Sequence, residues 1–234
     1  MGKVKVRNAK KEEAKSDHPS GAAHETTKQL LISAAIKLFA SHGYAGTSVR
    51  EISELAKVNI SLVSYYFNGK EGLYQACLDR FGRENLELAE RILHPAENAE
   101  EVRVRLQMFI EQMLVCYTDE PELTAIIHRE CELGLPVARD IFTQTFLKVF
   151  ECLLKFFESA AKKGLIRKDI EPFIAASLFI GSLNQLGRLN SLNEKLFNFS
   201  VQMPAVRKKL EEQILPIFLE GLSARGLEPK ENSK

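Results

Sequence analysis

The segment from Thr47 to Tyr74 constrains the fold most, because it holds closely spaced signals for starting and ending helices. Ser48 follows Thr47, and Glu51 stands a few positions later; a hydroxyl residue with a glutamate at this spacing caps the N-terminus of a helix. The apolar residues of one helical face follow, and they are Val49, Ile52, Leu55 and Ala56. We therefore predict a helix that begins at about Thr47 and runs for about three turns.

A second short helix is predicted directly after a tight turn. Asn59 is its expected cap, Ile60 to Phe67 would form it, and Asn68-Gly69 would end it. Two short helices joined by a tight turn make a helix-turn-helix, whose second helix lies in the major groove of DNA. The segment therefore predicts a DNA-binding element.

The composition of the second helix agrees with a surface that faces DNA. No acidic residue occurs from Lys57 to Lys70, and small polar side chains there would reach base edges while Lys70 approaches the backbone. The predicted DNA contacts are Thr47, Ser48, Arg50, Asn59, Ile60, Ser61, Ser64, Tyr65, Tyr66 and Lys70. The alternative is that the adjacent tyrosines and the Ser/Asn cluster belong to a capped, half-buried helix with no role in DNA binding.

The run from Leu31 to Leu78 resembles the N-terminal domain of the tetracycline-repressor-like (TetR) family of bacterial transcriptional regulators. The resemblance is carried by AAIKLFASHGY, GTSVREIS, the Ala56 and Val58 of the turn, YYF at 65 to 67 and Lys70-Glu71. Many members have Lys-Gly early in the recognition helix and Tyr at its fourth exposed position, where this chain has Ile60-Ser61 and Ser64. The resemblance implies a homodimer that binds a double-stranded operator, and a C-terminal domain with an effector pocket.

Charge is distributed unevenly along the chain. Residues 1–70 hold 11 Lys or Arg and 6 Asp or Glu, a net charge of +5, whereas residues 71–234 hold 21 and 25, a net charge of −4. The positive end contains the helix-turn-helix, as phosphate binding requires. The first 11 residues carry five of these basic side chains and would form an arm that either reaches a minor groove or only solubilises the protein.

Four regions are expected. Residues 1–24 would be a flexible basic arm, because they contain almost no large apolar side chains. Residues 25–70 would be the DNA-binding domain, with a first helix from Thr26 or Thr27 to about Ser41. Residues 71–224 would be an effector-binding and dimerisation domain, and residues 225–234 a flexible tail. A long helix from Lys70 to about Leu93 would link the two domains mechanically.

The C-terminal region is predicted to be an all-α bundle, since it contains no alternating β-branched run. Turn signals divide it into helices at about 99–118, 121–133, 137–163, 171–190 and 203–223, with an Asn-rich connection at 190–200. The helices at 171–190 and 203–223 are apolar on more than one face and are expected to form a four-helix dimer interface. The interface residues would be Phe179, Leu183, Leu186, Leu210, Ile214 and Phe218. The alternative is an ordinary buried core.

The centre of the bundle is predicted to be aromatic, because the chain has 14 phenylalanines and no tryptophan. Apolar cavities with a few polar groups are where small ligands bind. The candidate effector pocket consists of Phe109, Met113, Cys116, His128, Glu130 and Phe146. A plain core is the alternative for each of these residues.

The pattern offers little for catalysis or for a cofactor. His128, Cys131 and Glu132 share one helical face and could ligate a metal, but no other His or Cys pair accompanies them. The four cysteines include no CxxC pair and are expected to be reduced thiols. Neither a secretory signal nor an apolar run of about 20 residues is present, so we expect a cytoplasmic protein that makes no membrane contact. Because no catalytic or ligand-binding motif stands out, we also expect that it is not an enzyme and has no metal or cofactor.

Two interpretations remain. The protein would be a ligand-responsive repressor that a small apolar or amphipathic effector releases from a palindromic operator, or a DNA-binding regulator whose bundle docks a protein partner. An enclosed cavity in the bundle would favour the first interpretation. A solid core with an exposed apolar patch would favour the second.

Overall fold

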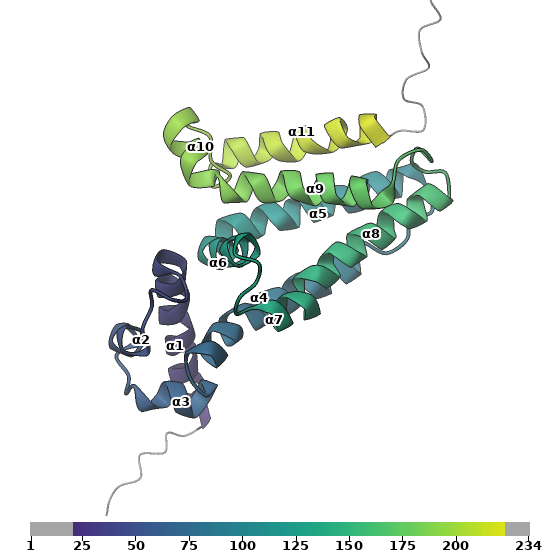
Figure 1. Cartoon of the computed structure of the whole chain (residues 1–234). Helices are drawn as coiled ribbons and strands as arrows, with labels where there is room; N and C mark the ends of the chain where they lie inside the picture. Colours follow the sequence, from purple (N-terminus) through teal and green to yellow (C-terminus); the bar gives the residue numbers. More distant parts are fainter. Residues whose placement is uncertain (1–20, 223–234) are drawn as a thin grey trace, which may run out of the picture.

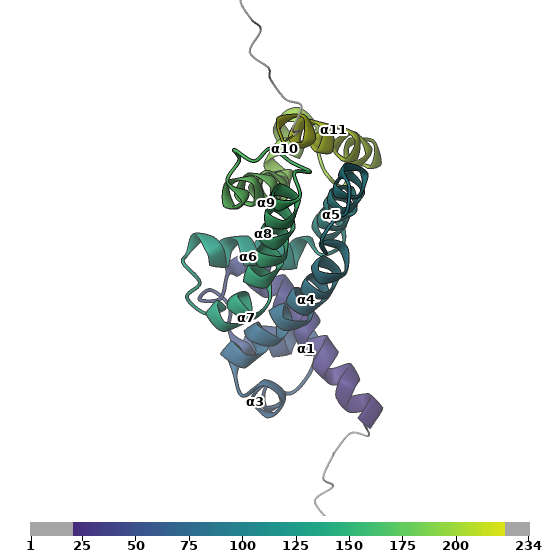
Figure 2. The same cartoon turned by 90° about the vertical axis from the view of Figure 1, so that its right-hand side faces the viewer.

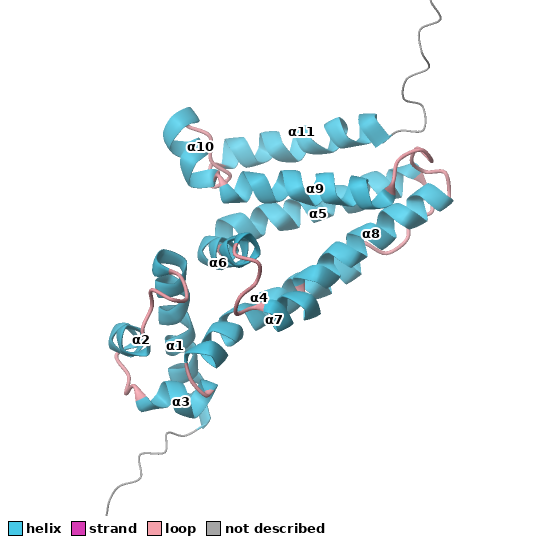
Figure 3. Ribbon diagram, viewed as in Figure 1, coloured by secondary structure: helices cyan, strands magenta, loops and turns pink. Residues whose placement is uncertain are grey.

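The computed structural model describes residues 21–222. In this range the chain forms eleven α-helices and no strand, which confirms the predicted all-α fold (Figure 3). In chain order the helices are α1 (Gly21–His42), α2 (Val49–Ala56), α3 (Ser61–Phe67), α4 (Lys70–Ile92), α5 (Ala99–Asp119), α6 (Pro121–Glu132), α7 (Arg139–Gln144), α8 (Phe146–Lys162), α9 (Pro172–Arg188), α10 (Asn190–Phe197) and α11 (Pro204–Leu222). Within the described residues, no helix combines the length and the apolar character needed to cross a bilayer.

Helices α1, α2 and α3 lie together at one end of the molecule, and α4 runs from them into a larger bundle (Figure 1). In the bundle, α8 packs against both α4 and α9, and α11 packs on α5. Helix α6 lies where the two parts meet, because it contacts α1 as well as α5 and α9 (Figure 2). Helices α4 and α6 therefore connect the bundle to the N-terminal helices, α4 through α1 and α3, and α6 through α1.

Two clusters of buried apolar side chains stabilise the chain, and α4 belongs to both. Leu73, Leu78 and Phe81 pack with side chains of α1, α2, α3 and α6. Ala89 and Ile92, at the far end of α4, pack with α5, α8, α9 and α11. The first cluster continues past residue 70, where the sequence suggested a domain boundary. It does so because the first half of α4 and part of α6 pack with α1, α2 and α3.

The predicted helix at 137–163 is divided in the structure into α7 and α8. Thr145 interrupts it with φ −128° and ψ −77°, and its hydroxyl donates to the carbonyl of Ile141 at 2.6 Å. The buried Thr145 lies against Gly82 of α4, where a Cβ added to the glycine would lie only 2.5 Å from the threonine oxygen. Close packing on α4 thus accompanies the break, which helical periodicity alone did not reveal.

Two further expectations are corrected at chain connections. The stretch expected to be an Asn-rich connection contains α10, which ends at Asn198 in a left-handed conformation with φ 50°. Helix α1 begins at Gly21, before the expected Thr26, because alanines favour helix there and His24 is anchored to Tyr66 by a 2.8 Å hydrogen bond. Most of the predicted arm, residues 1–20, and the predicted tail, 225–234, lie outside the described residues.

Candidate DNA-binding surface and internal cavity

The start of α2 is fixed by a reciprocal cap. The Ser48 hydroxyl accepts a hydrogen bond from the Glu51 amide at 3.2 Å, and the Glu51 carboxylate accepts one from the Ser48 amide at 2.8 Å. The Ser48 hydroxyl also donates to the Glu51 carboxylate at 2.7 Å, and this hydrogen bond, followed by the one from the Ser48 amide, lowers the pKa of Glu51. The helix therefore begins at Val49 with Ser48 as its cap, two residues later than the predicted start at Thr47.

Thr47 is buried and does not face solvent. Its hydroxyl lies 2.9 Å from the carbonyl oxygen of Gly43 and 3.2 Å from that of Leu38, which are the acceptors open to it. This geometry corrects the expectation that Thr47 contacts DNA, because its hydroxyl holds the link between α1 and α2. Arg50 on α2 is exposed and pairs with the neighbouring Glu54 at 2.8 Å.

Helix α3 has one buried and one exposed face. Val63 and Phe67 point into the cluster shared with α1 and α4. Asn59 is the expected cap of the helix; its side chain accepts the Ser61 amide at 2.9 Å, but the N-cap position is Ile60, which makes no side-chain cap hydrogen bond. On α3 and in the turn before it, the exposed candidates for DNA contact are Asn59, Ile60, Ser61, Ser64 and Tyr65; Ser48 and Arg50 at the start of α2 are exposed as well. A narrow polar surface with one large aromatic ring is therefore available to a groove.

Tyr66 and Lys70 have their polar atoms engaged inside the chain. The Tyr66 hydroxyl lies 2.8 Å from Nδ1 of His24 and ties α3 to the first turn of α1. The Lys70 ammonium donates to the carbonyls of Tyr44 at 2.9 Å and Thr47 at 3.0 Å and lies 4.2 Å from the centre of the Tyr44 ring. These contacts fasten the start of α4 to the α1–α2 link; Lys70 is partly exposed, and its contact with a phosphate stays a prediction.

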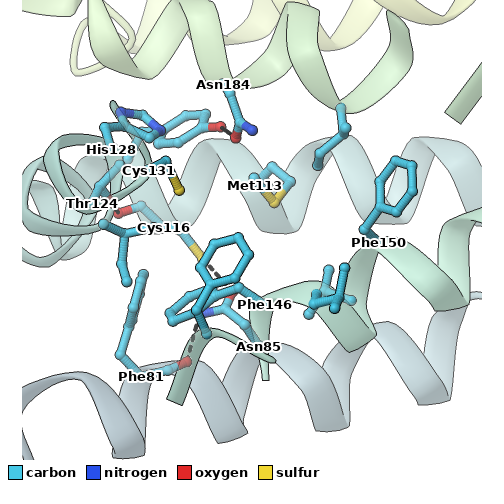
Figure 4. Close-up of a pocket in the computed structure, with 16 residues that line it drawn as sticks. Phe81, Asn85, Met113, Cys116, Thr124, His128, Cys131, Phe146, Phe150 and Asn184 are labelled. Atoms are coloured by element: carbon cyan, nitrogen blue, oxygen red, sulfur yellow. Dashed lines mark hydrogen bonds between the residues drawn. The ribbon is translucent and has the colours of Figure 1, made fainter. Parts of the chain in front are cut away.

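A partly open cavity of about 270 Å³ lies among the helices of the bundle (Figure 4). Its wall is formed by Phe81, Asn85, Met113, Cys116, Tyr117, Thr124, Ile127, His128, Cys131, Phe142, Phe146, Leu147, Val149, Phe150, Ile180 and Asn184. These residues come from α4, α5, α6, α7, α8 and α9. The wall is mainly apolar, and its lining residues carry no Asp, Glu, Lys or Arg, which is the composition of a site for a small uncharged ligand.

Four of the six predicted pocket residues line this cavity, namely Met113, Cys116, His128 and Phe146. Phe109 does not; it is buried in the bundle core, where its ring lies 6.3 Å from that of Phe179. Glu130 does not either, because its buried carboxylate accepts hydrogen bonds from the Tyr74 hydroxyl at 2.8 Å and the Ala138 amide at 3.1 Å. Both residues therefore serve packing.

Sequence reasoning missed two asparagines that supply polar groups to the cavity. Asn85 on α4 accepts a hydrogen bond from the Cys116 thiol at 3.0 Å and donates to the Phe81 carbonyl at 2.7 Å. Asn184 on α9 accepts a hydrogen bond from the Tyr117 hydroxyl at 2.9 Å. Each asparagine interrupts a largely apolar helical face, and that interruption was the available signal.

Burial in the cavity wall shifts the pKa values of His128 and Cys116 in the direction that favours their uncharged forms. Burial, and then the nearby charge of Arg188, lower the pKa of His128. Burial raises the pKa of the Cys116 thiol. Glu132 turns away to pair with Arg188 at 2.6 Å, so the three candidate metal ligands on this helix do not converge; the described residues contain no group of three or more potential ligands placed to hold a metal ion.

The predicted dimer residues lie on the inner side of α9 and α11. Phe179 and Leu183 are fully buried within this chain, and Phe179 packs on Phe218 with ring centres 5.0 Å apart. Leu186, Leu210, Ile214 and Phe218 are partly buried against the same core. Phe179 and Leu183 are therefore core residues rather than interface residues, because the helical pattern identified an apolar face that the chain itself covers.

Comparison with known proteins decides the family. The family described as bacterial regulatory proteins, tetR family, matches residues 31–77. The HTH-type transcriptional regulator TtgR of Pseudomonas putida is 32% identical over 162 residues, which span 65% of this chain and 74% of TtgR. The chain belongs to the TetR family. It is therefore a DNA-binding transcriptional regulator, and the resemblance of residues 31–78 is confirmed.

Other TetR-family relatives match most of the chain with lower identity. The HTH-type transcriptional repressor NicS, from another strain of Pseudomonas putida, is 27% identical over 87% of this chain and 93% of NicS. The probable regulator YttP of Bacillus subtilis (strain 168) is 30% identical, and the match spans 56% of this chain and 64% of YttP. Bacillus subtilis FadR, solved with stearoyl-CoA, shares the fold at a TM-score of 0.66, with 16% identity over 83% of this chain and 98% of FadR.

Proposed function

We propose that this TetR-family regulator is a repressor that leaves a palindromic operator when a small apolar or amphipathic effector fills the internal cavity. The observation that carries the proposal is the position of the cavity, because its wall includes α4 and α6, the two helices that also pack on α1. The relative NicS is a repressor by name, and the neighbour FadR was solved with stearoyl-CoA, which agrees with this role.

Helix α6 gives the proposed effector a route to the DNA-binding helices. Ile127 and His128 line the cavity, and the next residue, Arg129, reaches the other way. Its guanidinium donates to the carbonyls of Phe39 at 3.0 Å and Ala40 at 2.9 Å, in the last turn of α1. An effector that displaces α6 would therefore shift α1, to an extent limited by its differential affinity for the two arrangements.

Binding to two half-sites requires a dimer, which we propose to form through the outer faces of α9 and α11. On α9 the side chains of Phe173, Ile174 and Leu178 are more than half exposed, and on α11 Ile217 is 70% exposed. In a dimer the two α3 helices must be separated by about one DNA turn, roughly 34 to 36 Å, to enter successive major grooves. A change of tilt in α4 would alter that spacing at both half-sites.

The alternative function, docking of a protein partner, draws support from α10. Leu192, Leu196 and Phe197 are exposed there, the last at 73%. The internal cavity favours the effector, because a chain that only docks a partner does not need a space of this kind.

The effector proposal is tested with a cavity-filling variant. An operator selected from random duplexes is titrated with wild type, with Cys116→Phe and with Val115→Phe, and binding is followed by fluorescence anisotropy. We expect Cys116→Phe either to weaken operator binding at least tenfold or to abolish the response to apolar ligands, because the added ring occupies the cavity. The control, Val115→Phe, places the same ring at a 39% exposed position on α5 and should behave as wild type. Wild-type operator binding and wild-type ligand response in Cys116→Phe would refute the proposal.

A further inference from the structure

A second hollow, which we call the outer pocket, lies on the other side of the cavity wall. It has a volume of about 470 Å³ and is bordered by α6, the end of α9, α10 and Gln202. Tyr117, Thr124 and His128 line both the cavity and the outer pocket. A single layer of side chains therefore separates an apolar interior from a polar surface site.

This layer is built from rings that hold each other in place. The Tyr117 hydroxyl donates a hydrogen bond to the Asn184 side chain, and the Tyr117 and His128 ring centres lie 6.3 Å apart. The Tyr117 ring fits against α9 only because residue 187 is glycine; a Cβ there would lie 2.5 Å from a ring carbon. A ligand that occupied both spaces would have to pass these three shared side chains.

The two arginines around the outer pocket are already engaged within the chain. Arg188 is paired with Glu132 at 2.6 Å, and Arg129 donates to the two α1 carbonyls. Glu194 adds an exposed carboxylate to the same wall. A ligand with an anionic head would thus meet a carboxylate and two engaged arginines, whereas hydroxyl or amide groups would find acceptors and donors. The cavity behind it offers no charge to a cationic or anionic group either.

We propose that the cavity and the outer pocket form one site for an uncharged amphiphile, with the apolar body in the cavity and a head rich in hydroxyl or amide groups in the outer pocket. Ser191, Glu194 and Gln202, all exposed on the outer wall, would hydrogen-bond the head. His128 and Tyr117 would lie beside the junction of body and head. This inference rests on the proposed effector role of the cavity and adds the class of ligand.

Three probes with the same octyl chain separate the contribution of the apolar body from that of the head group. They are 1-octanol, octanoate and octyl β-D-glucoside, each kept below its critical micelle concentration. Binding to the full-length protein is measured by calorimetry. We expect the glucoside to bind about tenfold more tightly than octanol, because its hydroxyls gain hydrogen bonds in the outer pocket. Octanoate should bind more weakly than octanol, since its charge loses water without gaining a free cation.

Variants of the outer wall assign the difference to the outer pocket. Glu194→Ala and Gln202→Ala should each reduce the affinity for the glucoside toward that for octanol and leave octanol binding unchanged. Gln213→Ala, an exposed glutamine on α11 away from both spaces, is the matched control and should change neither.

The outcomes distinguish the two proposals. If octanol binds and Cys116→Phe abolishes that binding, but the glucoside is no tighter than octanol or octanoate is the tightest of the three, the ligand class is wrong and the effector role stands. If none of the three probes binds to the wild-type protein, both this inference and the effector role are overturned.

Discussion

Several side chains near the DNA-binding surface act as internal fasteners. The Thr47 hydroxyl and the Lys70 ammonium both bond to carbonyls of the α1–α2 link, and Tyr66 bonds to His24. The exposed candidates are the residues available for direct contact with DNA, and Tyr65, 63% exposed, is the largest of them. The polar residues near the DNA-binding surface are therefore of two kinds: some hold the helices in position through internal hydrogen bonds, and others are exposed and available for contact with DNA.

His128 predicts a pH dependence of stability. Because the fold lowers its pKa from the ordinary value of 6.5, the unfolded chain takes up a proton at a higher pH than the folded chain does. The resulting stabilisation is present above pH 6.5 and is lost as the pH falls through the lowered value. Urea unfolding between pH 7.5 and 5 should show a smaller loss of stability for His128→Gln than for wild type. The exposed His42→Gln should retain the wild-type loss; equal pH profiles for wild type and His128→Gln would contradict the prediction.

At the scale of elements, α6 has two functional faces. One lines the cavity through Ile127 and His128, and the other supports α1 through Ile126 and Arg129. Arg129 caps the C-terminal end of α1, where free carbonyls and the helix dipole favour a cation. Under the proposed effector role, a displacement of the cavity-lining face of α6 would move the face that contacts α1.

Removal of the Arg129 side chain should weaken this support. Arg129→Ala is expected to lower the free energy of unfolding by roughly 1 to 3 kcal/mol, because two charge-assisted hydrogen bonds are lost. Arg91→Ala, at an exposed position near the end of α4, is the control and should cost less than about 0.5 kcal/mol in urea unfolding.

The same variant tests coupling. In a double-mutant cycle, the effect of Cys116→Phe on operator affinity should shrink when Arg129 is alanine. Strictly additive effects would show that the two sites do not communicate through this arginine.

Local signals in the sequence predicted the helix-turn-helix well, because caps and breaks depend on a few neighbouring residues. The cap that Ser48 and Glu51 form at the start of α2 is an example. Periodicity identified α9 and α11 as apolar but could not tell which face the chain covers itself, so Phe179 and Leu183 were misassigned. The cavity was predicted only in part. Asn85 and Asn184 line it because α4 and α9, which are far apart in the sequence, both form its wall.

At the scale of the whole molecule, the exposed apolar faces of α9 and α11 lie far from the helix-turn-helix (Figure 1). A dimer joined at that end would leave both α3 helices free to approach DNA. The position of each α3 would then depend on the long α4 that connects the two ends.

Charges on these faces should separate the subunits. Leu178→Glu combined with Ile217→Glu is expected to give monomers, because an apolar interface would have to bury unpaired carboxylates. Sedimentation velocity measures the change, and operator affinity should fall with it. Val104→Glu with Met108→Glu, at exposed positions on α5, is the matched control. An unchanged dimer in the α9–α11 variant, or monomers in the control, would place the interface elsewhere.

The buried cluster that joins α1, α4 and α6 also limits how regulators of this kind can be recombined. A graft of the DNA-reading helices onto another protein, cut after residue 70, would leave Leu73, Leu78 and Phe81 behind and expose their partners to water. A chimera that keeps its operator preference must therefore also receive the first half of α4. The α6 helix of the recipient must supply the contacts to α1 that Ile126 and Arg129 make in this chain. The natural unit of exchange is larger than the motif that touches DNA.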